Sequence, residues 1–349
     1  MRKWNTLLMF QNLLKKIHTI LKELILFKEI EMQDNELNPD ALEIINDVRI
    51  AEKSGERIPM YKMNHLEARE AYLAMRSALS PPAPDVLEIK DIEIPVSNYN
   101  IKARYYRGIN NNTDSILPVT IFFHGGGWVI GDLDTHDVVC RQLANQGKFD
   151  VIAIDYRMGP EFRFPTAIDD AINSINWVKN NPSKLPIDTS KIAVCGDSAG
   201  GNIAAVCCIN SKINEGPLIS FQALIYPSTH MGAHYPSKDK YDGYILSKKL
   251  MNWFEEKYID KNQLNDWRAA PILYEDLSNL PESLIVVAGC DPLKDEGISY
   301  GKALLKAGNS SETINFDGQI HGFLTMGARI KDTEKLIKLL SEKITQALS

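Results

Sequence analysis

From about residue 86 onward, short apolar segments alternate with helical stretches along the chain. Eight segments have the composition of β-strands, and most of the later ones are nearly continuous apolar runs. The predicted strands are Val86–Val96, Asn100–Arg107, Pro118–Phe123, Val151–Tyr156, Lys191–Gly196, Phe221–Tyr226, Ser283–Ala288 and Glu312–Phe316. Apolar strands that alternate with helices are typical of a parallel sheet covered on both faces. We therefore expect an α/β fold with a mostly parallel central sheet and helices on both of its faces.

The residues before the Pro81-Pro82 pair have helical periodicity instead. Helices are predicted over residues 1–31, Pro39–Lys53 and His65–Leu79. The alternation of strands and helices also stops between Thr229 and Arg268, in a segment rich in Tyr, Lys and Trp. We interpret this segment as a helical element that is inserted into the α/β domain.

The charge and cysteine content exclude some classes of protein. A net charge of −6 and a pI near 5.7 argue against nucleic-acid binding, which normally needs a basic excess. The five cysteines are odd in number and scattered, and no CxxC pair occurs. This pattern favours reduced, mostly buried thiols over a disulfide framework. We therefore expect a cytoplasmic protein.

The N-terminal segment has a charge of its own. Residues 1–28 carry six basic side chains and one acidic side chain, a net charge of +5 on an acidic chain. Apolar residues recur there at helical spacing, but no apolar run reaches the roughly 18 residues that a membrane span requires. A basic amphipathic helix can bind a membrane surface, whereas an apolar stripe more often packs on a protein core. We favour packing on the core, keep membrane-surface association as the alternative, and leave the oligomeric state open with a homodimer as one alternative.

The first chemical motif is Gly196-Asp197-Ser198-Ala199-Gly200, a G-x-S-x-G sequence between a predicted strand and a predicted helix. This context predicts a nucleophile elbow, a sharp turn that raises the serine hydroxyl above the sheet. Gly196 and Gly200 are small enough to let the strand and the helix pass closely. The positive end of the helix would stabilise a developing oxyanion. A glycine-rich loop that only connects the two elements is the alternative.

The second motif is HGGGW, directly after the predicted strand that ends at Phe123. Successive glycines leave backbone N–H groups unshielded by side chains, and acyl transfer needs such donors around the tetrahedral oxyanion. We predict that Gly126, Gly127 and Ala199 supply the N–H groups of an oxyanion hole. A phosphate-binding loop would require a Lys-Ser/Thr ending or a GxGxxG run, and neither is present here.

An acidic residue follows the predicted strand Ser283–Ala288, in the sequence Gly289-Cys290-Asp291. An aspartate just past the carboxyl end of a strand lies at the active edge of an open α/β sheet. Asp291 meets this condition. Asp295 and Glu296 lie about one helical turn further on and are predicted to cap the helix or to form ion pairs. A solvated cluster of charges is the alternative interpretation.

Of the seven histidines, only His321 follows the last predicted strand. The chain order Ser198, Asp291, His321 is the order of the catalytic triad in α/β-hydrolases. His124 lies in the glycine loop and is predicted, with Gly125, to have a structural role near the site. We therefore predict a Ser-His-Asp triad, a mechanism that needs neither a metal ion nor an organic cofactor.

Taken together and in this order, the motifs HGGGW, GDSAGGN, DPLKDEG and HGF resemble the hormone-sensitive-lipase family of α/β-hydrolase esterases. The segments Tyr156–Pro165 and Leu277–Pro281 are similar to further motifs of that family. The resemblance covers about residues 85–345. It departs from the family at Phe162, where a histidine is usual, and at Gly159, where an alanine is common. Both positions are interpreted as structural.

The resemblance also implies a helical cap over the catalytic domain. We assign residues 86–228 and 269–349 to the α/β-hydrolase domain, residues 229–268 to an inserted cap element, and residues 1–85 to an N-terminal helical cap segment. Aromatic side chains of the inserted element are expected to enclose the acyl pocket, and these are Tyr241, Tyr244, Trp253 and Phe254.

We therefore expect a serine carboxylesterase that hydrolyses small-molecule esters with short to medium acyl chains through an acyl-enzyme. The same triad would serve an amidase or a peptidase, and the basic N-terminal helix would suit a lipase that acts at a membrane surface. A non-catalytic ligand receptor on the same fold is a further alternative. It is disfavoured because the related plant hormone receptors lack the triad histidine, which is present here as His321.

Overall fold

A computed structural model of the chain describes residues 36–181 and 184–349, and in these residues eight strands form one sheet. The strands are β1 (Glu88–Val96), β2 (Tyr99–Arg107), β3 (Leu117–Phe123), β4 (Asp150–Ile154), β5 (Ile187–Asp197), β6 (Ile219–Ile225), β7 (Glu282–Cys290) and β8 (Ser311–Ile320). Their order across the sheet is β1-β2-β4-β3-β5-β6-β7-β8. The pairs β1–β2 and β2–β4 are antiparallel and the remaining pairs are parallel. The predicted strands and the predicted α/β fold are therefore confirmed.

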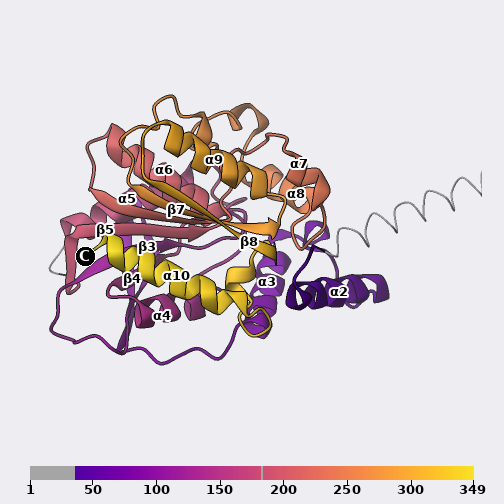
Figure 1. The fold of residues 1–349 in the computed structure, drawn as a ribbon, viewed down its shortest axis with the longest axis horizontal. Helices are drawn as coiled ribbons and strands as arrows, with labels where there is room; N and C mark the ends of the chain where they lie inside the picture. Colours follow the sequence, from indigo (N-terminus) through magenta and orange to yellow (C-terminus); the bar gives the residue numbers. More distant parts are fainter. Residues whose placement is uncertain (1–35, 182–183) are drawn as a thin grey trace, which may run out of the picture.

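Helices cover both faces of the sheet (Figure 1). On one face lie α5 (Thr166–Asn180), α6 (Ala199–Ile213) and α9 (Lys294–Lys306), and on the other lie α4 (Asp137–Gln146) and α10 (Asp332–Ala347). The central strand β3 contributes side chains to the apolar cores on both faces of the sheet, because alternate side chains of a strand point to opposite faces. Ile121 and Phe123 belong to one apolar cluster and Phe122 belongs to the other. All five cysteines are free and buried, as predicted.

Four more helices lie together at the end of the sheet where β8 terminates (Figure 1). They are α2 (Pro39–Ser54), α3 (His65–Leu79), α7 (Pro236–Lys240) and α8 (Lys248–Tyr258). Short 3-10 turns complete the described structure at Met60–Lys62, Lys261–Gln263, Pro271–Leu273 and Phe323–Thr325. Helix α3 begins with a capping box, in which Asn64 accepts from the N–H of Glu67 while Glu67 accepts from the N–H of Asn64.

The helices predicted over Pro39–Lys53 and His65–Leu79 are thus confirmed, the first one residue longer than expected. The helical element expected between Thr229 and Arg268 is present as α7 and α8. The helix predicted over residues 1–31 lies outside the described residues. The division of the chain into a catalytic domain and a cap stays a prediction.

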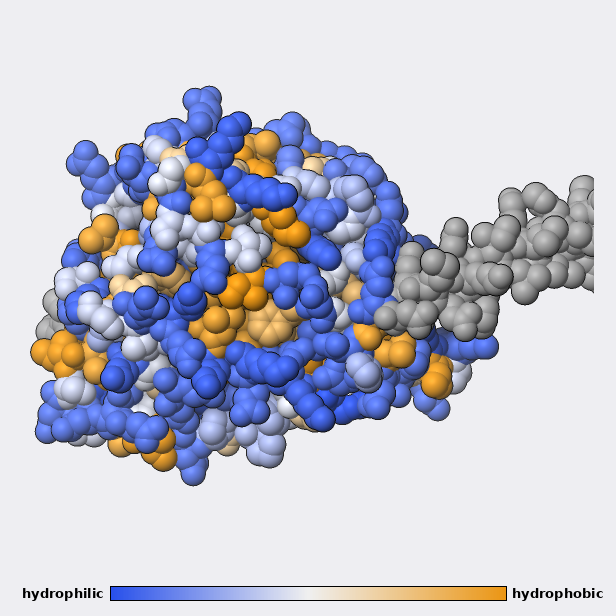
Figure 2. Space-filling model, in the orientation of Figure 1, coloured by the Kyte–Doolittle hydropathy of each residue, from blue (hydrophilic) through white to orange (hydrophobic). Residues whose placement is uncertain are grey.

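The surface seen in Figure 2 is dominated by hydrophilic side chains, with apolar ones gathered near the middle of the view, over the edge strand β8. On this strand Ile314 and Phe316 are only partly buried, and both pack against the second apolar cluster. Among the described residues, no helix is long and apolar enough to cross a membrane.

A buried ion pair joins the antiparallel strands β2 and β4. The guanidinium of Arg107 binds Asp150 in bidentate fashion, at 2.6 Å and 3.1 Å, and both side chains are fully buried. The hydroxyl of Tyr105 donates to the same carboxylate at 2.8 Å. Arg107 also donates to the carbonyl groups of Thr113 and Pro186. One side chain therefore joins two strands and two loops at this end of the sheet.

Replacing Arg107 with methionine leaves the buried carboxylate of Asp150 without its cation. We expect Arg107→Met to lower the free energy of unfolding by about 3–5 kcal/mol, measured by urea denaturation. The control is Lys338→Met, which removes an exposed ion pair with Glu342 and should cost less than about 1 kcal/mol. Equal losses in the two variants would contradict the assignment of Arg107–Asp150 as a stabilising pair.

Candidate active site

The candidate nucleophile, Ser198, lies at the sharp turn between β5 and α6. Its backbone angles are φ 55° and ψ −115°, a strained conformation for a residue other than glycine. Backbone hydrogen bonds hold this conformation, and one of them runs from the N–H of Ser228 to the carbonyl of Ser198 at 3.2 Å. The N–H of Ser198 donates to the carbonyl of Ile225 at 2.8 Å, and the carbonyl of Ser198 accepts from Asn202 at 3.1 Å. The predicted strand–turn–helix context of the G-x-S-x-G sequence is therefore present.

The glycines of this motif lie where the strand and the helix approach each other most closely. A Cβ atom added to Gly200 would lie 1.9 Å from the carbonyl oxygen of Phe123. A Cβ atom at Gly196 would lie 2.4 Å from the backbone of Gly200. Any side chain at either position would push the helix away from β3 and β5. The spacing of the motif thus follows from steric contact, as the sequence predicted.

The structure brings Ser198, His321 and Asp291 together in one chain of hydrogen bonds. Nε2 of His321 lies 2.9 Å from Oγ of Ser198, and Nδ1 lies 2.8 Å from Oδ2 of Asp291. The other carboxylate oxygen of Asp291 accepts from the N–H of Leu293 at 2.8 Å. Asp291 is completely buried, and the ring of Tyr226 packs against the imidazole at 4.8 Å. The three side chains have the geometry of a nucleophile, a base and an orienting acid.

The two acidic residues after Asp291 point elsewhere, as predicted. Asp295 accepts from the N–H of Ser237 in α7 at 2.9 Å. Glu296 is fully buried, accepts from the N–H of Thr229 at 2.9 Å and lies 2.8 Å from the ammonium of Lys238. Burial raises the pKa of Glu296, against the opposing charge of Lys238. Both carboxylates therefore attach the inserted element to α9.

Among the described residues, no group of three or more His, Cys, Asp or Glu side chains could hold a metal ion.

The glycine loop after β3 supplies free backbone donors next to Ser198. Within the described residues, the N–H groups of Gly126, Gly127 and Ala199 make no hydrogen bond to another protein group. Gly126 and Gly127 line the same cavity as Ser198 and His321. Gly126 has φ +127° and Gly127 has φ +59°, so the loop follows a path that side chains disfavour. The three predicted donors thus lie unpaired around the candidate nucleophile.

His124, at the start of this loop, is enclosed by other side chains. Its ring stacks on Tyr156 at 4.4 Å, and the Tyr156 hydroxyl donates to the His124 carbonyl at 2.7 Å. Nδ1 lies 2.9 Å from the carbonyl oxygen of Gly125. Burial, together with the neighbouring His136, lowers the pKa of His124 to about 4. The imidazole is therefore neutral near pH 7 and packs between the loop and the ring of Tyr156, which supports the predicted structural role.

Asp197, directly before the nucleophile, has a function that the sequence reasoning missed. Its buried carboxylate accepts from the N–H of Gly125 at 2.7 Å and from the Tyr226 hydroxyl at 3.3 Å. Nε2 of His136 lies 3.1 Å away, an ion-pair contact without hydrogen-bond alignment. Burial alone would raise the pKa of Asp197, but His136, the Gly125 N–H and Arg76 together hold it below its ordinary value. The charged carboxylate therefore ties the oxyanion loop to the nucleophile turn.

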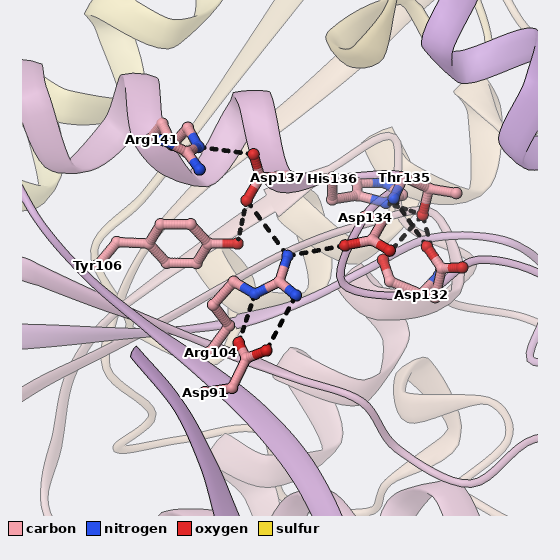
Figure 3. A network of polar contacts seen from close by, with 9 residues as sticks. All are labelled: Asp91, Arg104, Tyr106, Asp132, Asp134, Thr135, His136, Asp137 and Arg141. Carbon is pink, nitrogen blue, oxygen red and sulfur yellow. Dashed lines mark hydrogen bonds and ion pairs between the residues drawn. The ribbon is translucent and has the colours of Figure 1, made fainter. Parts of the chain in front are cut away.

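A polar network holds the segment before α4, which carries His136 (Figure 3). Arg104 of β2 lies at its centre and binds Asp91 of β1 at 2.6 Å and Asp134 at 2.8 Å. It also reaches Asp137, the first residue of α4, at 3.4 Å. One guanidinium thereby joins β1, β2 and α4. This network keeps His136 in place beside the buried carboxylate that precedes the nucleophile.

A cavity of about 370 Å³ opens above the triad. Its floor contains Gly127, Ser198 and His321, and its walls come from α2, α3 and α8. The apolar residues of the lining are Ile45, Val48, Pro59, Met60, Met75, Trp128, Ile130, Met231, Ile245, Leu246, Leu250, Met251, Phe254 and Leu293. The cavity is large enough for a small organic ligand.

Only one of the four aromatic residues that were expected to enclose this pocket lies in its lining, and that residue is Phe254. The prediction was wrong for the others, because their side chains are used in packing. Trp253 donates to the carbonyl of Met63 at 3.3 Å, and Tyr241 donates to Glu36 at 2.9 Å. Tyr244 is buried in the second apolar cluster.

Comparison with known proteins agrees with this geometry. Residues 120–325 match the α/β hydrolase-fold family. The chain is 31% identical to ethyl acetate hydrolase of Pseudomonas putida over 318 residues, which cover 89% of this chain and 99% of that protein. The chain belongs to the α/β-hydrolase-fold family. Its predicted membership of the hormone-sensitive-lipase branch is confirmed by the same comparison.

Two further members of this family are similar over most of their length. The carboxylic ester hydrolase LipN of Mycobacterium tuberculosis is 37% identical over 281 residues, covering 76% of this chain and 73% of that protein. A solved structure of an ester hydrolase from the metagenome of Lake Arreo has a TM-score of 0.85 and 35% identity, covering 89% of this chain and 98% of that chain. This α/β-hydrolase therefore shares both sequence and fold with esterases.

The proposed function of the loop N–H groups in oxyanion binding can be tested by substituting Gly126. A Cβ atom at Gly126 would lie 2.0 Å from the carbonyl oxygen of Ile130, so Gly126→Ala must displace the loop. We expect a loss of roughly 10²–10³-fold in kcat on a soluble p-nitrophenyl ester. The control is Gly55→Ala at the end of α2, where φ is also positive (+82°) but no atom lies within 4 Å. Near-wild-type kcat in Gly126→Ala would show that this loop does not stabilise the oxyanion.

Proposed function

We propose that this α/β-hydrolase is a serine carboxylesterase that hydrolyses small-molecule esters through an acyl-enzyme. The observation that supports it most directly is the continuous chain of hydrogen bonds from Asp291 through His321 to Ser198, at 2.8 Å and 2.9 Å, below a cavity. The esterase names of the relatives support the same reaction class.

In this proposal, His321 removes the proton from Ser198 while Oγ attacks the ester carbonyl carbon. Asp291 holds the imidazole through Nδ1 and stabilises its protonated form. The carbonyl oxygen becomes an oxyanion that accepts hydrogen bonds from Gly126, Gly127 and Ala199. His321 then protonates the leaving alkoxide, and an alcohol departs. Water repeats these steps on the acyl-enzyme and releases the acid.

The electrostatic environment favours this sequence of steps. Asp291 has no contact with solvent, so its charge is directed at His321 rather than screened by water. Ala199 is the first residue of α6, so its free N–H coincides with the positive end of a helix. The proposed oxyanion would thus form next to preorganised dipoles that do not need to reorient during the reaction.

We further propose that the segments at the carboxyl end of the sheet form a cap that selects substrates. The cavity lies between core residues such as Ser198 and residues of α2, α3 and α8, which supports this division. Whether residues 1–28 belong to the cap or bind a membrane surface is a separate question, and we favour the cap. The five free, buried cysteines fit a reducing cytoplasmic location.

The nucleophile is tested by Ser198→Ala, which removes the attacking oxygen and little else. We expect kcat for a p-nitrophenyl ester to fall by roughly 10⁴-fold or more, because the triad acts as one unit. Circular dichroism should show an unchanged fold. Covalent labelling by an organophosphate should disappear with the hydroxyl, and labelling that persisted would place the nucleophile elsewhere.

The acyl preference is tested with p-nitrophenyl esters of increasing chain length. A cavity of about 370 Å³ whose walls also contain charged side chains has limited room for a long alkyl chain. We expect the best kcat/KM with acyl chains of about two to about eight carbons. An optimum at about sixteen carbons would contradict the predicted substrate class and favour the lipase alternative.

A further inference from the structure

The cavity wall contains a buried arginine that the proposed mechanism does not use. Arg76 lies in α3 and lines the cavity, yet only 5% of its surface is exposed. It lies next to the triad, because its Nη2 would be 2.9 Å from a Cβ atom at Gly322, the residue that follows His321. The absence of a side chain at Gly322 leaves the guanidinium room beside the candidate base.

The protein itself provides little compensation for this charge. Nη1 of Arg76 donates to the carbonyl of Gly322 at a long distance of 3.4 Å, and the guanidinium lies 4.7 Å from the centre of the Tyr72 ring. Nε is buried and has no hydrogen-bond partner. No carboxylate in the described part of the chain forms an ion pair with it. A buried guanidinium normally binds an anion, because removing an unpaired charge from water is costly.

The charged residues around Arg76 do not neutralise its guanidinium either. The charge of Arg76 helps to lower the pKa of Asp197, but the two residues form no ion pair, and Asp197 has closer partners in Gly125, Tyr226 and His136. Arg57 lines the same wall and is 4.0 Å from Glu52. Burial lowers the pKa of Arg57, and the charge of Arg76 adds to this effect against the opposing charge of Glu52. The lining of the whole cavity carries five cations and four carboxylates, an excess of one positive charge; they are Arg49, Arg57, Arg76, Lys238 and Lys249 against Glu52, Asp197, Asp242 and Glu255.

We propose that Arg76 binds a carboxylate of the substrate, so that the preferred substrates are esters that carry one free carboxylate. This inference rests on the proposed esterase function. An excess of one positive charge matches a single carboxylate better than a phosphate dianion. A planar guanidinium also fits a carboxylate in bidentate fashion. A half-ester of a short dicarboxylic acid has this chemistry.

The position of Arg76 determines how far the carboxylate of the substrate can lie from its ester carbonyl. The guanidinium is adjacent to the residue after His321, so it lies on the order of 10 Å or less from the nucleophile. A carboxylate separated from the ester carbonyl by a few carbon atoms can span this gap. In the reaction, the acyl C–O bond breaks, water supplies a hydroxyl group to the acyl carbon, and the alkoxy oxygen takes a proton. A half-ester of a dicarboxylic acid gives an alcohol and the dicarboxylic acid, whereas an ester whose alcohol carries the carboxylate gives a carboxylic acid and a hydroxy acid.

The test uses two pairs of isosteric substrates that differ only in charge. Monoethyl glutarate and ethyl 4-carbamoylbutanoate place the carboxylate or its neutral amide on the acyl side. The compounds 3-(butanoyloxy)propanoate and 3-(butanoyloxy)propanamide place them on the alcohol side. Acid release is followed in a pH-stat, and the readout is the ratio of kcat/KM for the anionic ester to that for its amide. Wild type should have a ratio above one for at least one pair.

In Arg76→Met this ratio should fall by roughly ten- to hundredfold, because a charge-assisted hydrogen bond is lost. Arg76→Lys should retain part of the preference, since it keeps the charge but not the planar fork. The control is Lys249→Met, which removes an exposed cation from the cavity rim near Tyr61. Its ratio should change by less than about twofold, because exposed charges are screened by solvent.

Several outcomes would overturn the proposal. A folded Arg76→Met enzyme with an unchanged ratio would show that Arg76 does not bind the anion. A wild-type enzyme that prefers the amide in both pairs would have the same consequence. If Arg76→Met does not fold, the wild-type ratio and its decrease in Arg76→Lys decide the question. Hydrolysis of neither anionic nor neutral esters by wild type would instead refute the esterase function.

Discussion

The carboxylate of Asp197 is buried between the loop that carries the oxyanion donors and the turn that carries Ser198. It is bonded to Gly125 at 2.7 Å and lies 3.1 Å from His136. His136 precedes α4, which Arg104 joins to β1 and β2. The position of the donors relative to the nucleophile therefore depends on this one charged group. Its low pKa, held down by those partners against the effect of burial, keeps it charged for that function.

The rest of the site follows from the direction of the strands. The carboxyl ends of β3, β5 and β7 lie at the same edge, because these strands belong to the parallel part of the sheet. The loops after them carry Gly126, Ser198 and Asp291, and the loop after β8 carries His321. The parallel strands thus bring together residues that are far apart in the sequence. The topology also explains why the triad can be recognised from its order along the chain.

The strands, the nucleophile turn and the triad could be predicted because each has a local signal. Apolar runs mark the strands, and glycine spacing marks the elbow. The functions of Asp197, Arg104 and Arg76 could not be predicted in this way. Each depends on contacts between segments that the sequence does not relate, such as Arg104 of β2 with Asp134 before α4. The prediction for the aromatic residues of the inserted element was wrong for the same reason. An aromatic side chain is expected to be buried, but the sequence does not indicate which surface it covers. Trp253, for example, donates a hydrogen bond to the carbonyl of Met63 instead of lining the cavity.

The two buried charges near the triad, Asp197 and Arg76, differ in how far other protein groups compensate them. This difference distinguishes a residue that positions the loop from a residue that can bind a ligand. Asp197 accepts hydrogen bonds from Gly125 and Tyr226 and lies 3.1 Å from Nε2 of His136, so its charge is compensated within the protein and serves to hold the loop. Arg76 has one long hydrogen bond and an aromatic ring, and its Nε has no partner. A charge that is already satisfied gains little from a ligand, whereas an unsatisfied one in a cavity wall gains the full interaction when an anion arrives. The α/β core therefore supplies the chemistry, and α3 supplies the charge that selects which ester reaches it.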